Sequence, residues 1–456
     1  MSKGHSFTIR TLGCKANQYD SQLLREDLLR RGFVECPGDA EDADVCIVNT
    51  CTVTAQSDAK SRQAIRTLKR QNPNARIVVT GCYAHTSPED VRNTGCVDAV
   101  FDNPSKEFLA ESICALLNVG KRFTGPPCRR ITFFSGHARA FVKIQDGCDK
   151  TCSYCIVRLA RGRNRSRPIP DIIGEIEALV SNGYREVVLT GIHIGSFGID
   201  HGGHENALPE LIENLRMIQG LTRVRLSSID PNEINGRLIA AIRCTPQVCR
   251  HLHLPLQSGS DAILREMNRH YTRDSYLRTL ALLRKESPGI SITGDVMVGF
   301  PGETEEDFRR TREVVREAEF SKVHIFPFSS RPGTPAEHLP HRVPPEVIRD
   351  RIARLSADAD AAALTSRQKY MGQTVEVLVE REVSPGKNAR LPPVMRNAAS
   401  VFEGFSSDYQ RTLFLTDGER IENLRNQIVG VRVEYLDERY LYGRLHYPLC
   451  PPRSPR

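Results

Sequence analysis

Three closely spaced cysteines constrain this chain more than any other feature of its sequence. Cys148, Cys152 and Cys155 fall within eight residues, directly after Ala140–Ile144, which is predicted as a β-strand. Three thiolates at this spacing can hold an iron–sulfur cubane and leave its fourth iron open to a small molecule. A structural zinc ion needs four ligands, and the nearest candidate, His137, precedes the strand. We therefore predict a cluster here, with zinc as the alternative.

Cysteine usage elsewhere points to a reducing compartment. The chain has 456 residues and 14 cysteines, and no apolar run approaches the ~20 residues that a membrane span needs. The segment Met1–Arg10 contains no apolar run either, so we expect no signal peptide, no membrane contact and a cytoplasmic location. The isolated cysteines are predicted to be inert thiols: Cys36, Cys46, Cys96, Cys114, Cys128, Cys244, Cys249 and Cys450.

The first part of the chain alternates strands with helices. Strands are predicted at Phe7–Leu12, Val45–Val48 and Arg76–Thr80, and helices at Gln18–Arg31 and Ser57–Arg70. A cysteine closely follows each strand, namely Cys14, Cys51 and Cys82. Because the carboxyl ends of parallel strands share one edge of a sheet, these cysteines are able to meet although they span 69 residues. Simple packing is the alternative for each of them.

A longer series of strands and helices occupies the middle of the chain. The predicted strands are Ala140–Ile144, Glu186–Thr190, Arg223–Ser227, Leu252–Leu256, Ile290–Val298 and Lys322–Phe326. The predicted helices include Asp171–Ser181, Asp261–Met267 and Glu305–Ala318. Six strands with helical crossovers predict an α/β unit whose parallel sheet curls into an incomplete barrel.

The last part of the chain has a different pattern. A helix is predicted at Pro344–Met371, and short alternating runs follow it at Thr374–Val379, Thr412–Leu415, Val429–Tyr435 and Leu441–Leu445. Such runs predict a small all-β barrel.

Several polar or small residues stand at the ends of the central strands, where a cofactor would bind. Gly191 lies in a turn that lets backbone approach a ligand, and Arg225 and Ser227 offer groups for a ribose or a carboxylate. Gln257 and Asp295 belong to the next strands, and Asp295 interrupts an apolar run. The alternatives are an ordinary turn, a helix cap and a structural buried carboxylate.

Basic residues gather at two places, within a net charge of +8. Five arginines follow the central cysteines and would steer phosphates of an RNA: Arg158, Arg161, Arg163, Arg165 and Arg167. A solvated loop is the alternative. In the carboxy-terminal part, basic residues alternate with aromatic ones, a pattern that suits loop RNA; these are Lys387, Arg390, Arg396, Arg411, Phe402, Phe405, Tyr409 and Phe414.

The spacing of the central cysteines, with Tyr154 before the last one, resembles the radical S-adenosylmethionine superfamily. Further segments are similar to the methylthiotransferase family within it: residues 11–18 (TLGCKANQ), 49–54 (NTCTVT), 80–82 (TGC), 298–304 (VGFPGET) and 326–334 (FPFSSRPGT). Residues 373–445 resemble the TRAM module, an RNA-binding β-barrel. The resemblance divides the chain into an amino-terminal domain (5–119), a radical core (134–366), a TRAM domain (369–447) and a tail (448–456).

The resemblance implies two [4Fe–4S] clusters. Cys148, Cys152 and Cys155 would hold the one that cleaves S-adenosylmethionine, with Tyr154 beside the cofactor, and Cys14, Cys51 and Cys82 the one that provides sulfur. One S-adenosylmethionine would methylate that sulfur and a second would supply the radical. The motif at Cys14 is similar to the branch acting on carbon 2 of N6-threonylcarbamoyladenosine at position 37 of tRNA. The family usually has proline where this chain has Arg158, so the resemblance does not predict the path of the local loop.

Other partners and functions also follow from the resemblance. A flavodoxin or ferredoxin would supply electrons, the sulfur donor is undefined, and a monomer is expected. The alternative substrates are isopentenyladenosine in tRNA and an aspartate of ribosomal protein S12. An alternative of another class is a non-enzymatic iron–sulfur RNA binder or redox sensor, which would not cleave S-adenosylmethionine.

Overall fold

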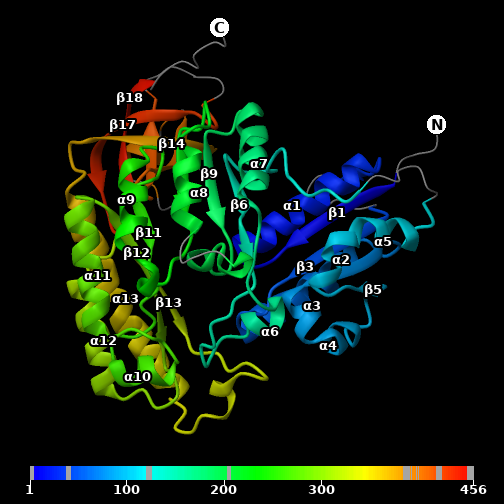
Figure 1. Ribbon diagram of the computed structural model, residues 1–456, viewed down its shortest axis with the longest axis horizontal. Helices are drawn as coiled ribbons and strands as arrows, with labels where there is room; N and C mark the ends of the chain where they lie inside the picture. The colour runs from blue at the N-terminus through cyan, green and yellow to red at the C-terminus, as the bar shows by residue number, and fades with distance from the viewer. Residues whose placement is uncertain are drawn as a thin grey trace.

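The computed structural model describes residues 5–36, 43–119, 126–202, 207–383, 391, 393–396, 398, 400–416 and 424–448. Figure 1 shows three β-structures in this part of the chain: a parallel sheet, an open barrel and a small closed barrel. The predicted α/β fold class, with an all-β barrel at the carboxy-terminal end, is confirmed.

The amino-terminal sheet is parallel throughout and has the order β2-β1-β3-β4-β5. Its strands are β1 (Ser6–Thr11), β2 (Val34–Glu35), β3 (Val45–Thr50), β4 (Arg76–Gly81) and β5 (Ala99–Val100). Helices α1 (Lys15–Arg30) and α5 (Leu109–Leu116) pack against one face and α2 (Ala55–Gln71) against the other. Leu28 and Ile65 are fully buried on these two faces, so the sheet is covered on both sides.

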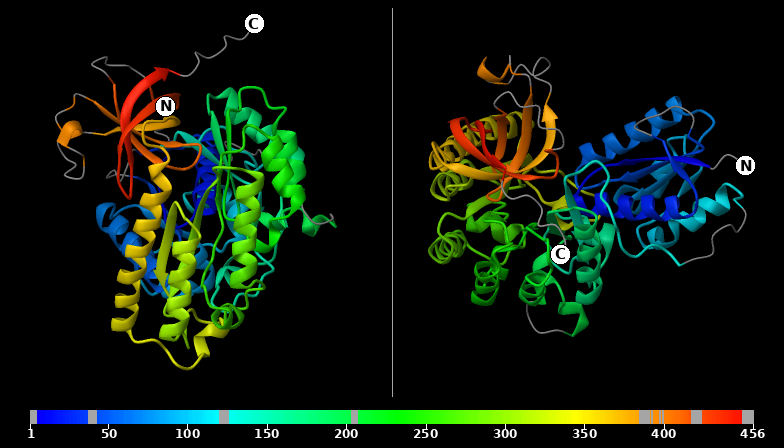
Figure 2. Two further views of the ribbon diagram at one scale, coloured as in Figure 1. Left: turned by 90° about the vertical axis from the view of Figure 1, so that its left-hand side faces the viewer. Right: turned by 90° about the horizontal axis from the view of Figure 1, so that it is seen from above.

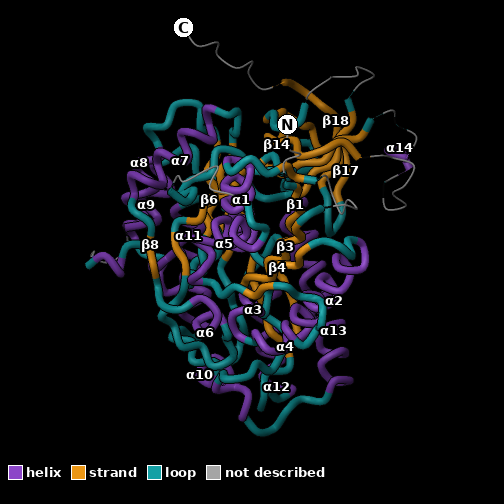
Figure 3. The backbone as a smooth tube through the Cα atoms, turned by 90° about the vertical axis from the view of Figure 1, so that its right-hand side faces the viewer, coloured by secondary structure: helices purple, strands orange, loops and turns teal. Residues whose placement is uncertain are grey.

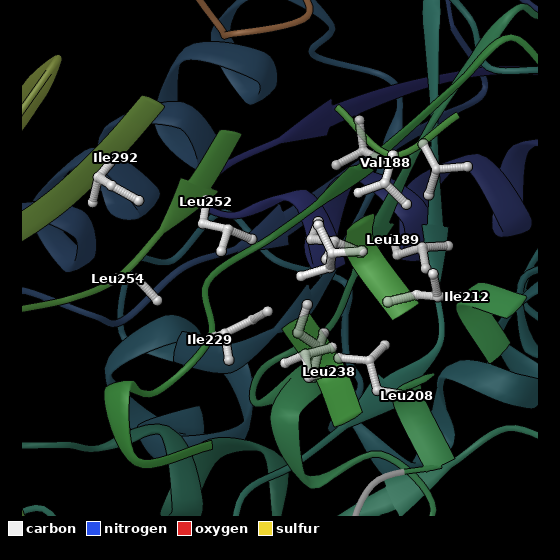
Figure 4. Packing of buried hydrophobic residues seen from close by; sticks show 14 of the residues in the cluster. Val188, Leu189, Leu208, Ile212, Ile229, Leu238, Leu252, Leu254 and Ile292 are labelled. Atoms are coloured by element: carbon white, nitrogen blue, oxygen red, sulfur yellow. The ribbon is translucent and has the colours of Figure 1, made fainter. Parts of the chain in front are cut away.

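The open barrel consists of two three-stranded parallel sheets, β10-β9-β6 and β11-β12-β13. The strands are β6 (Arg139–Lys143), β9 (Glu186–Thr190), β10 (Arg223–Leu226), β11 (His251–His253), β12 (Ser291–Val298) and β13 (Lys322–Pro327). The outer helices are α7 (Ile169–Ser181), α8 (Ala207–Leu215), α9 (Gly236–Cys244), α10 (Asp261–Glu266), α11 (Arg273–Glu286) and α12 (Glu305–Glu317). Figure 4 shows the apolar layer between strands and helices. In the described chain neither β6 nor β13 has a strand partner on its outer side, so the barrel is open between them.

A long helix, α13 (Pro345–Gln368), connects the open barrel to the closed one. The closed barrel has the order β14-β15-β16-β18-β17. Its strands are β14 (Thr374–Val383), β15 (Val401–Ser406), β16 (Arg411–Leu415), β17 (Ile428–Leu436) and β18 (Leu441–Pro448), and a short helix, α14 (Pro393–Arg396), precedes β15. The sequence did not predict β15, because a buried Glu403 interrupts its apolar pattern. Arg381 pairs with that carboxylate at 2.7 Å.

The closed barrel lies against the open barrel at the end where the strands of the open barrel begin, and Figure 2 shows the two barrels side by side. The turn between β15 and β16 provides this contact. Arg225 donates hydrogen bonds to the carbonyls of Ser406 and Ser407, each at 3.0 Å, and Arg223 donates to the carbonyl of Glu376 at 2.9 Å. The two barrels are therefore joined by buried polar contacts.

Short elements complete the opposite end, where the open barrel meets the amino-terminal unit. They are β7 (Gln145–Asp146), β8 (Arg165–Ser166), α3 (Cys82–Thr86), α4 (Pro88–Arg92) and α6 (Val157–Arg161). Figure 3, seen from the amino-terminal side, shows α6 and α3 well away from β14, β17 and β18. Helix α6 packs against α3, so the segment after the central cysteines touches the segment that contains Cys82.

Candidate functional site

The three central cysteines lie in a loop whose shape is fixed by hydrogen bonds. Strands β7 and β8 pair at its base, and the amide of Cys148 donates to the carbonyl of Gly162 at 3.0 Å. At its tip, Ser153 Oγ donates to the carbonyl of Glu266 at the end of α10, at 2.7 Å. The amide of Cys155 donates to the carbonyl of Cys152 at 3.1 Å. These hydrogen bonds within the chain therefore fix the shape of the loop.

Hydrogen-bond donors surround the sulfur atoms of this loop. Burial opposes ionisation of Cys148, but a hydrogen bond with His193 and its charge bring the pKa of that thiol below its usual value. Arg269 Nη1 lies 3.3 Å from Cys152 Sγ. Cys155 is more enclosed, and burial raises its pKa to about 12. Donors to sulfur favour thiolate ligands and tune bound clusters.

A cavity of about 370 Å³ opens beside the central cysteines. Tyr154, Gln257 and Asp295 line it, as the sequence predicted for a cofactor pocket. Gly191 and Ser227 each directly precede a lining residue. Among the described side chains, Gln257 Oε1 and Ser227 Oγ are buried polar atoms without a partner. Buried polar atoms normally have one, so this pocket fits a polar ligand such as S-adenosylmethionine.

Arg225 lies away from this cavity, in contrast to the other predicted residues. Its Nε donates to Glu186 at 3.0 Å, its remaining donors bind the closed barrel, and its guanidinium covers the ring of Tyr409. The side chain is 2% exposed. The structure thus places Arg225 at the contact between the barrels.

The amino-terminal cysteines meet at one edge of their sheet. The parallel register pairs Thr50 with Gly81, so Cys51 and Cys82 follow neighbouring strand ends. A Cβ atom at Gly13 would lie 2.7 Å from Cys51 Cβ, which puts Cys14 beside Cys51 and requires glycine, with φ +94°, at that position. Burial raises the pKa of Cys51, and the charges of Cys14 and Cys82 raise it further. The three thiols are therefore close neighbours.

Two asparagines hold this edge together. Asn17 Nδ2 donates to the carbonyls of Leu12 and Thr50, at 2.8 and 2.9 Å. Asn49 Nδ2 donates to the carbonyl of Asn17 and to Ser21 Oγ, both at 2.9 Å. These bonds join the segments that precede Cys14 and Cys51, so the amino-terminal cysteines are pre-positioned.

The cavity beside the central cysteines extends to the amino-terminal unit. Val53 and Thr54, which follow Cys51, form part of its wall. The contact is held by Ser329 Oγ, which accepts from the amide of Ala55 at 3.0 Å, and by Arg331, which pairs with Asp58 at 2.5 Å. Within the described residues, no three Cys, His, Asp or Glu side chains converge tightly enough for a single metal ion. Cysteine thiolates are the usual ligands of iron–sulfur clusters, so the chemistry of both groups fits a cluster.

The arginines after the central cysteines divide into two kinds. Arg158 is exposed and lines the cavity, and Arg163 and Arg165 are also exposed. Arg161, in contrast, is 4% exposed and contacts Asn17, while its Nη1 pairs with Asp146 at 2.8 Å. Arg167 pairs with Glu175 at 2.5 Å. The predicted role in steering RNA therefore suits Arg158, Arg163 and Arg165, whereas Arg161 and Arg167 are engaged inside the protein.

The carboxy-terminal aromatics stack in two pairs. Phe402 and Phe414 stack inside the closed barrel with ring centroids 5.7 Å apart. Phe405 and Tyr409 stack at 4.9 Å beneath Arg139 at the contact with the open barrel. Of the basic residues predicted with them, Arg396 is exposed and Arg411 pairs with Glu403, whereas Lys387 and Arg390 lie outside the described residues.

Sequence reasoning missed several charged residues of the site. Lys150 pairs with Asp230 at 2.6 Å, and Arg269 pairs with the same carboxylate at 2.7 Å. Asp230 comes from the turn after β10 and Arg269 from the turn after α10, so no local pattern links them to the cysteines.

Cys46, predicted as an inert thiol, is fully buried in the amino-terminal core. No helix in the described chain has the length and apolarity to cross a membrane.

Two known families match this chain. Residues 6–102 match the uncharacterized protein family UPF0004, and residues 142–315 match the radical SAM superfamily. These ranges contain all six cysteines of the site.

Curated relatives match nearly the whole chain. The threonylcarbamoyladenosine tRNA methylthiotransferase MtaB of Thermotoga maritima is 39% identical over 94% of this chain and 94% of its own length. The protein of the same name from Bacillus subtilis is 35% identical over 93% of this chain and 92% of its own. A tRNA-2-methylthio-N(6)-dimethylallyladenosine synthase of Acidothermus cellulolyticus is 39% identical over 82% of this chain and 77% of its own.

A solved structure supports the fold. The radical S-adenosylmethionine methyltransferase TsrM of Kitasatospora setae, solved with cobalamin and a [4Fe–4S] cluster, covers 73% of this chain and 77% of its own, with a TM-score of 0.55 and 16% identity. This similarity confirms the predicted fold of the radical core.

Proposed function

Since the chain belongs to the family of radical S-adenosylmethionine methylthiotransferases, we propose that it attaches a methylthio group to carbon 2 of N6-threonylcarbamoyladenosine in tRNA. The observation that carries this proposal is the cavity that contains the central cysteines and reaches Val53 and Thr54, the residues that follow Cys51. Radical generation and sulfur transfer must act on the same carbon, so a cavity that extends from one group of cysteines to the segment after a cysteine of the other suits this reaction.

The cofactors proposed are two [4Fe–4S] clusters and S-adenosylmethionine. The cluster at Cys148, Cys152 and Cys155 would supply the electron that splits S-adenosylmethionine, and the radical so formed can attack a carbon without an acidic hydrogen. Gln257, Ser227 and Asp295 would bind polar groups of the cofactor. Apolar side chains in the cavity wall, such as Ile156, Met297 and Phe326, would limit contact between water and a reactive radical.

The amino-terminal cysteines would bind the second cluster, which provides the sulfur. Asn17 and Asn49 orient the backbone of this site, as their hydrogen bonds indicate. Arg158, Arg163 and Arg165 would contact the RNA backbone. We further propose a low-potential flavodoxin or ferredoxin as electron donor, a monomeric enzyme, a cytoplasmic location and the domain division 5–119, 134–366 and 369–447.

A second substrate deserves comparison because relatives named for it are as similar as those named for the first. The dimethylallyladenosine synthase relative shares 39% identity with this chain. The experiment must therefore also include RNA that contains dimethylallyladenosine.

The test uses anaerobically reconstituted protein and anticodon stem-loop RNAs that contain either modified adenosine. We expect mass spectrometry to detect a methylthio derivative of threonylcarbamoyladenosine, together with 5′-deoxyadenosine. Product from the dimethylallyl RNA alone would move the substrate assignment to the second candidate. Absence of 5′-deoxyadenosine from reduced protein would instead favour the non-enzymatic RNA binder or redox sensor.

A further inference from the structure

Two cations and two carboxylates gather beside the central cysteines. Lys150 pairs with Asp230 at 2.6 Å and with Glu233 at 3.3 Å. Arg269 pairs with the same Asp230 at 2.7 Å, and the side chains of these two residues are only 9% and 5% exposed. Lys150, Asp230 and Arg269 also line the cavity beside the cysteines. Because a buried ion pair by itself is weak evidence for stability, this pair calls for a role in the reaction.

Arg269 brings its charge into contact with a cysteine. Its Nη1 lies 3.3 Å from Cys152 Sγ, while its Nη2 donates to Asp230 at 2.7 Å. The guanidinium also covers the ring of Tyr271, 5.0 Å from the ring centroid. That ring is held in place because the Tyr271 hydroxyl donates to the carbonyl of Leu256 at 2.9 Å. The guanidinium therefore bridges a cysteine sulfur and a carboxylate, with an aromatic ring against its face.

The turn that contains Arg269 is anchored to the cysteine loop. Asn268 Nδ2 donates to the carbonyl of Thr151 at 2.9 Å and to its Oγ1 at 2.8 Å. The amide of Ser153 donates to the carbonyl of Met267 at 3.1 Å. These bonds join the residues on both sides of Cys152 to the residues just before Arg269. The contact between the guanidinium and the sulfur is therefore fixed by the backbone of both segments.

Asp230 is positioned independently of the cysteine loop. It caps the short 3₁₀ helix Pro231–Glu233, where its Oδ1 accepts from the amide of Asn232 at 3.1 Å. Its other oxygen, Oδ2, is the one that pairs with Lys150 and Arg269. One oxygen thus holds the carboxylate in place, and the other compensates the two cations.

A charge beside an iron–sulfur cluster changes the reduction potential of that cluster. One electron from the low-potential donor reduces the cluster and then passes to S-adenosylmethionine, where a carbon–sulfur bond breaks to give methionine and the 5′-deoxyadenosyl radical. Reduction adds negative charge to the cluster. A cation or a hydrogen bond at sulfur therefore stabilises the reduced state and raises the potential, whereas a nearby carboxylate lowers it. Salt screens such buried charges only weakly.

We propose that Arg269 and Asp230 set the reduction potential of the central cluster in opposite directions. Arg269 acts through its contact with Cys152, and Asp230 is a positioning residue that holds Arg269 and compensates its charge. Arg269 keeps the cluster reducible by its donor, and Asp230 keeps it a strong enough reductant to split the cofactor. The inference rests on the proposed function, since it concerns the cluster that the central cysteines would hold.

The experiment measures the midpoint potential of reconstituted R269M, R269K and D230N proteins by a redox titration followed by electron paramagnetic resonance. Each variant is titrated in the wild-type chain and in the Cys82→Ala chain, whose one remaining cluster identifies the signal. The matched controls are R265M and D274N, which replace exposed residues of α10 and α11. Iron content and the affinity of the oxidised protein for S-adenosylmethionine are measured on the same samples.

We expect R269M to lower the potential and D230N to raise it, with iron content unchanged. Loss of a hydrogen bond to a charged group changes an equilibrium constant about tenfold, and for one electron a tenfold change is about 59 mV. R269K keeps the charge but loses the planar fork, so its potential should fall less than that of R269M. Both controls should have the wild-type potential.

Shifts in the same direction in R269M and D230N, or no shift in either, overturn the inference. If one of them loses its iron, the direction of the shift in the other decides. Iron loss in both would mean that the pair only supports the loop, and weakened cofactor binding at an unchanged potential would assign the pair to the cofactor's carboxylate; both results contradict the inference. If wild-type protein binds no iron, or gives no 5′-deoxyadenosine when reduced, the proposed function itself is wrong.

Discussion

The two groups of cysteines are built in opposite ways. Cys148, Cys152 and Cys155 lie in one loop, whose own hydrogen bonds and short hairpin fix its shape. Cys14, Cys51 and Cys82 come from three strand ends and meet only because the sheet is parallel and in register. The first site is therefore a local property of the sequence, whereas the second is a property of the folded domain. Substitutions far from the cysteines should therefore disturb the central site less than the amino-terminal site.

The largest expected effects come from removing one ligand of each group. Cys155→Ala should abolish both S-adenosylmethionine cleavage and methylthio product, because the radical site loses a ligand. Cys82→Ala should abolish product but leave cleavage within about threefold of wild type, because all three ligands of the radical site remain. Chromatography of 5′-deoxyadenosine and of digested RNA measures both. Retained product in Cys82→Ala would mean that the amino-terminal cysteines do not bind the sulfur-donating cluster.

A change at Gly13 should disrupt the amino-terminal site without removing a ligand. Alanine at φ +94° is strained by about 1–2 kcal/mol, and its Cβ would lie 2.7 Å from Cys51 Cβ. We expect Gly13→Ala to lower the iron content from about eight to about four atoms per chain. The matched control is Gly183→Ala, since Gly183 also has positive φ but no neighbour within 4 Å of the added Cβ. Equal iron loss in both variants would contradict the steric argument.

Arg161 tests how closely the two groups depend on each other. It lies in α6, directly after the central loop, and contacts Asn17 beside the amino-terminal cysteines. Arg161→Met should lower product up to about 100-fold by misplacing the two sites, while S-adenosylmethionine cleavage continues. Arg349→Met removes an exposed arginine of α13 and is the control for loss of charge. A parallel decrease of product and cleavage in Arg161→Met would show that its effect is not positional.

The smallest expected effect concerns the folding stability of the protein at low pH. Burial would raise the pKa values of Asp20 and Asp146, but Lys143, Arg161 and, for Asp20, Lys106 hold both well below the usual value. Carboxylates with lowered pKa contribute stability above their unfolded pKa of about 3.9, and lose it as pH falls toward the folded value. The difference in unfolding temperature between wild type and Asp146→Asn should therefore stay constant from pH 8 to 5. It should shrink only below about pH 4.

Much of this fold was predictable because its strands are apolar and its strand ends contain distinctive residues. β9 has the predicted bounds, Glu186–Thr190, and the predicted strand Arg223–Ser227 ends one residue earlier in the structure. Tyr154, Gln257 and Asp295 line the predicted pocket. These predictions depend on local pattern and on the rule that parallel strand ends gather.

The sequence could not reveal contacts between residues that are far apart in the chain. From the sequence Arg225 was predicted to bind a cofactor, but in the structure it donates hydrogen bonds to the carbonyls of Ser406 and Ser407. Arg161 belongs to a basic run that suggests RNA, yet it is buried against Asp146. β15 was missed because Glu403 is buried in an ion pair with Arg381. In each case the partner of a charged side chain, and not its own position, determines its role.

The turn between β15 and β16, residues 407–410, is synthesised long after the strands that it contacts. During translation Arg223 and Arg225 are made before the carbonyls of Phe405, Ser406 and Ser407 that accept their hydrogen bonds. A nascent chain that stops before β15 therefore contains these arginine donors without their acceptors. The two barrels can join only after β15 and the turn that follows it have left the ribosome.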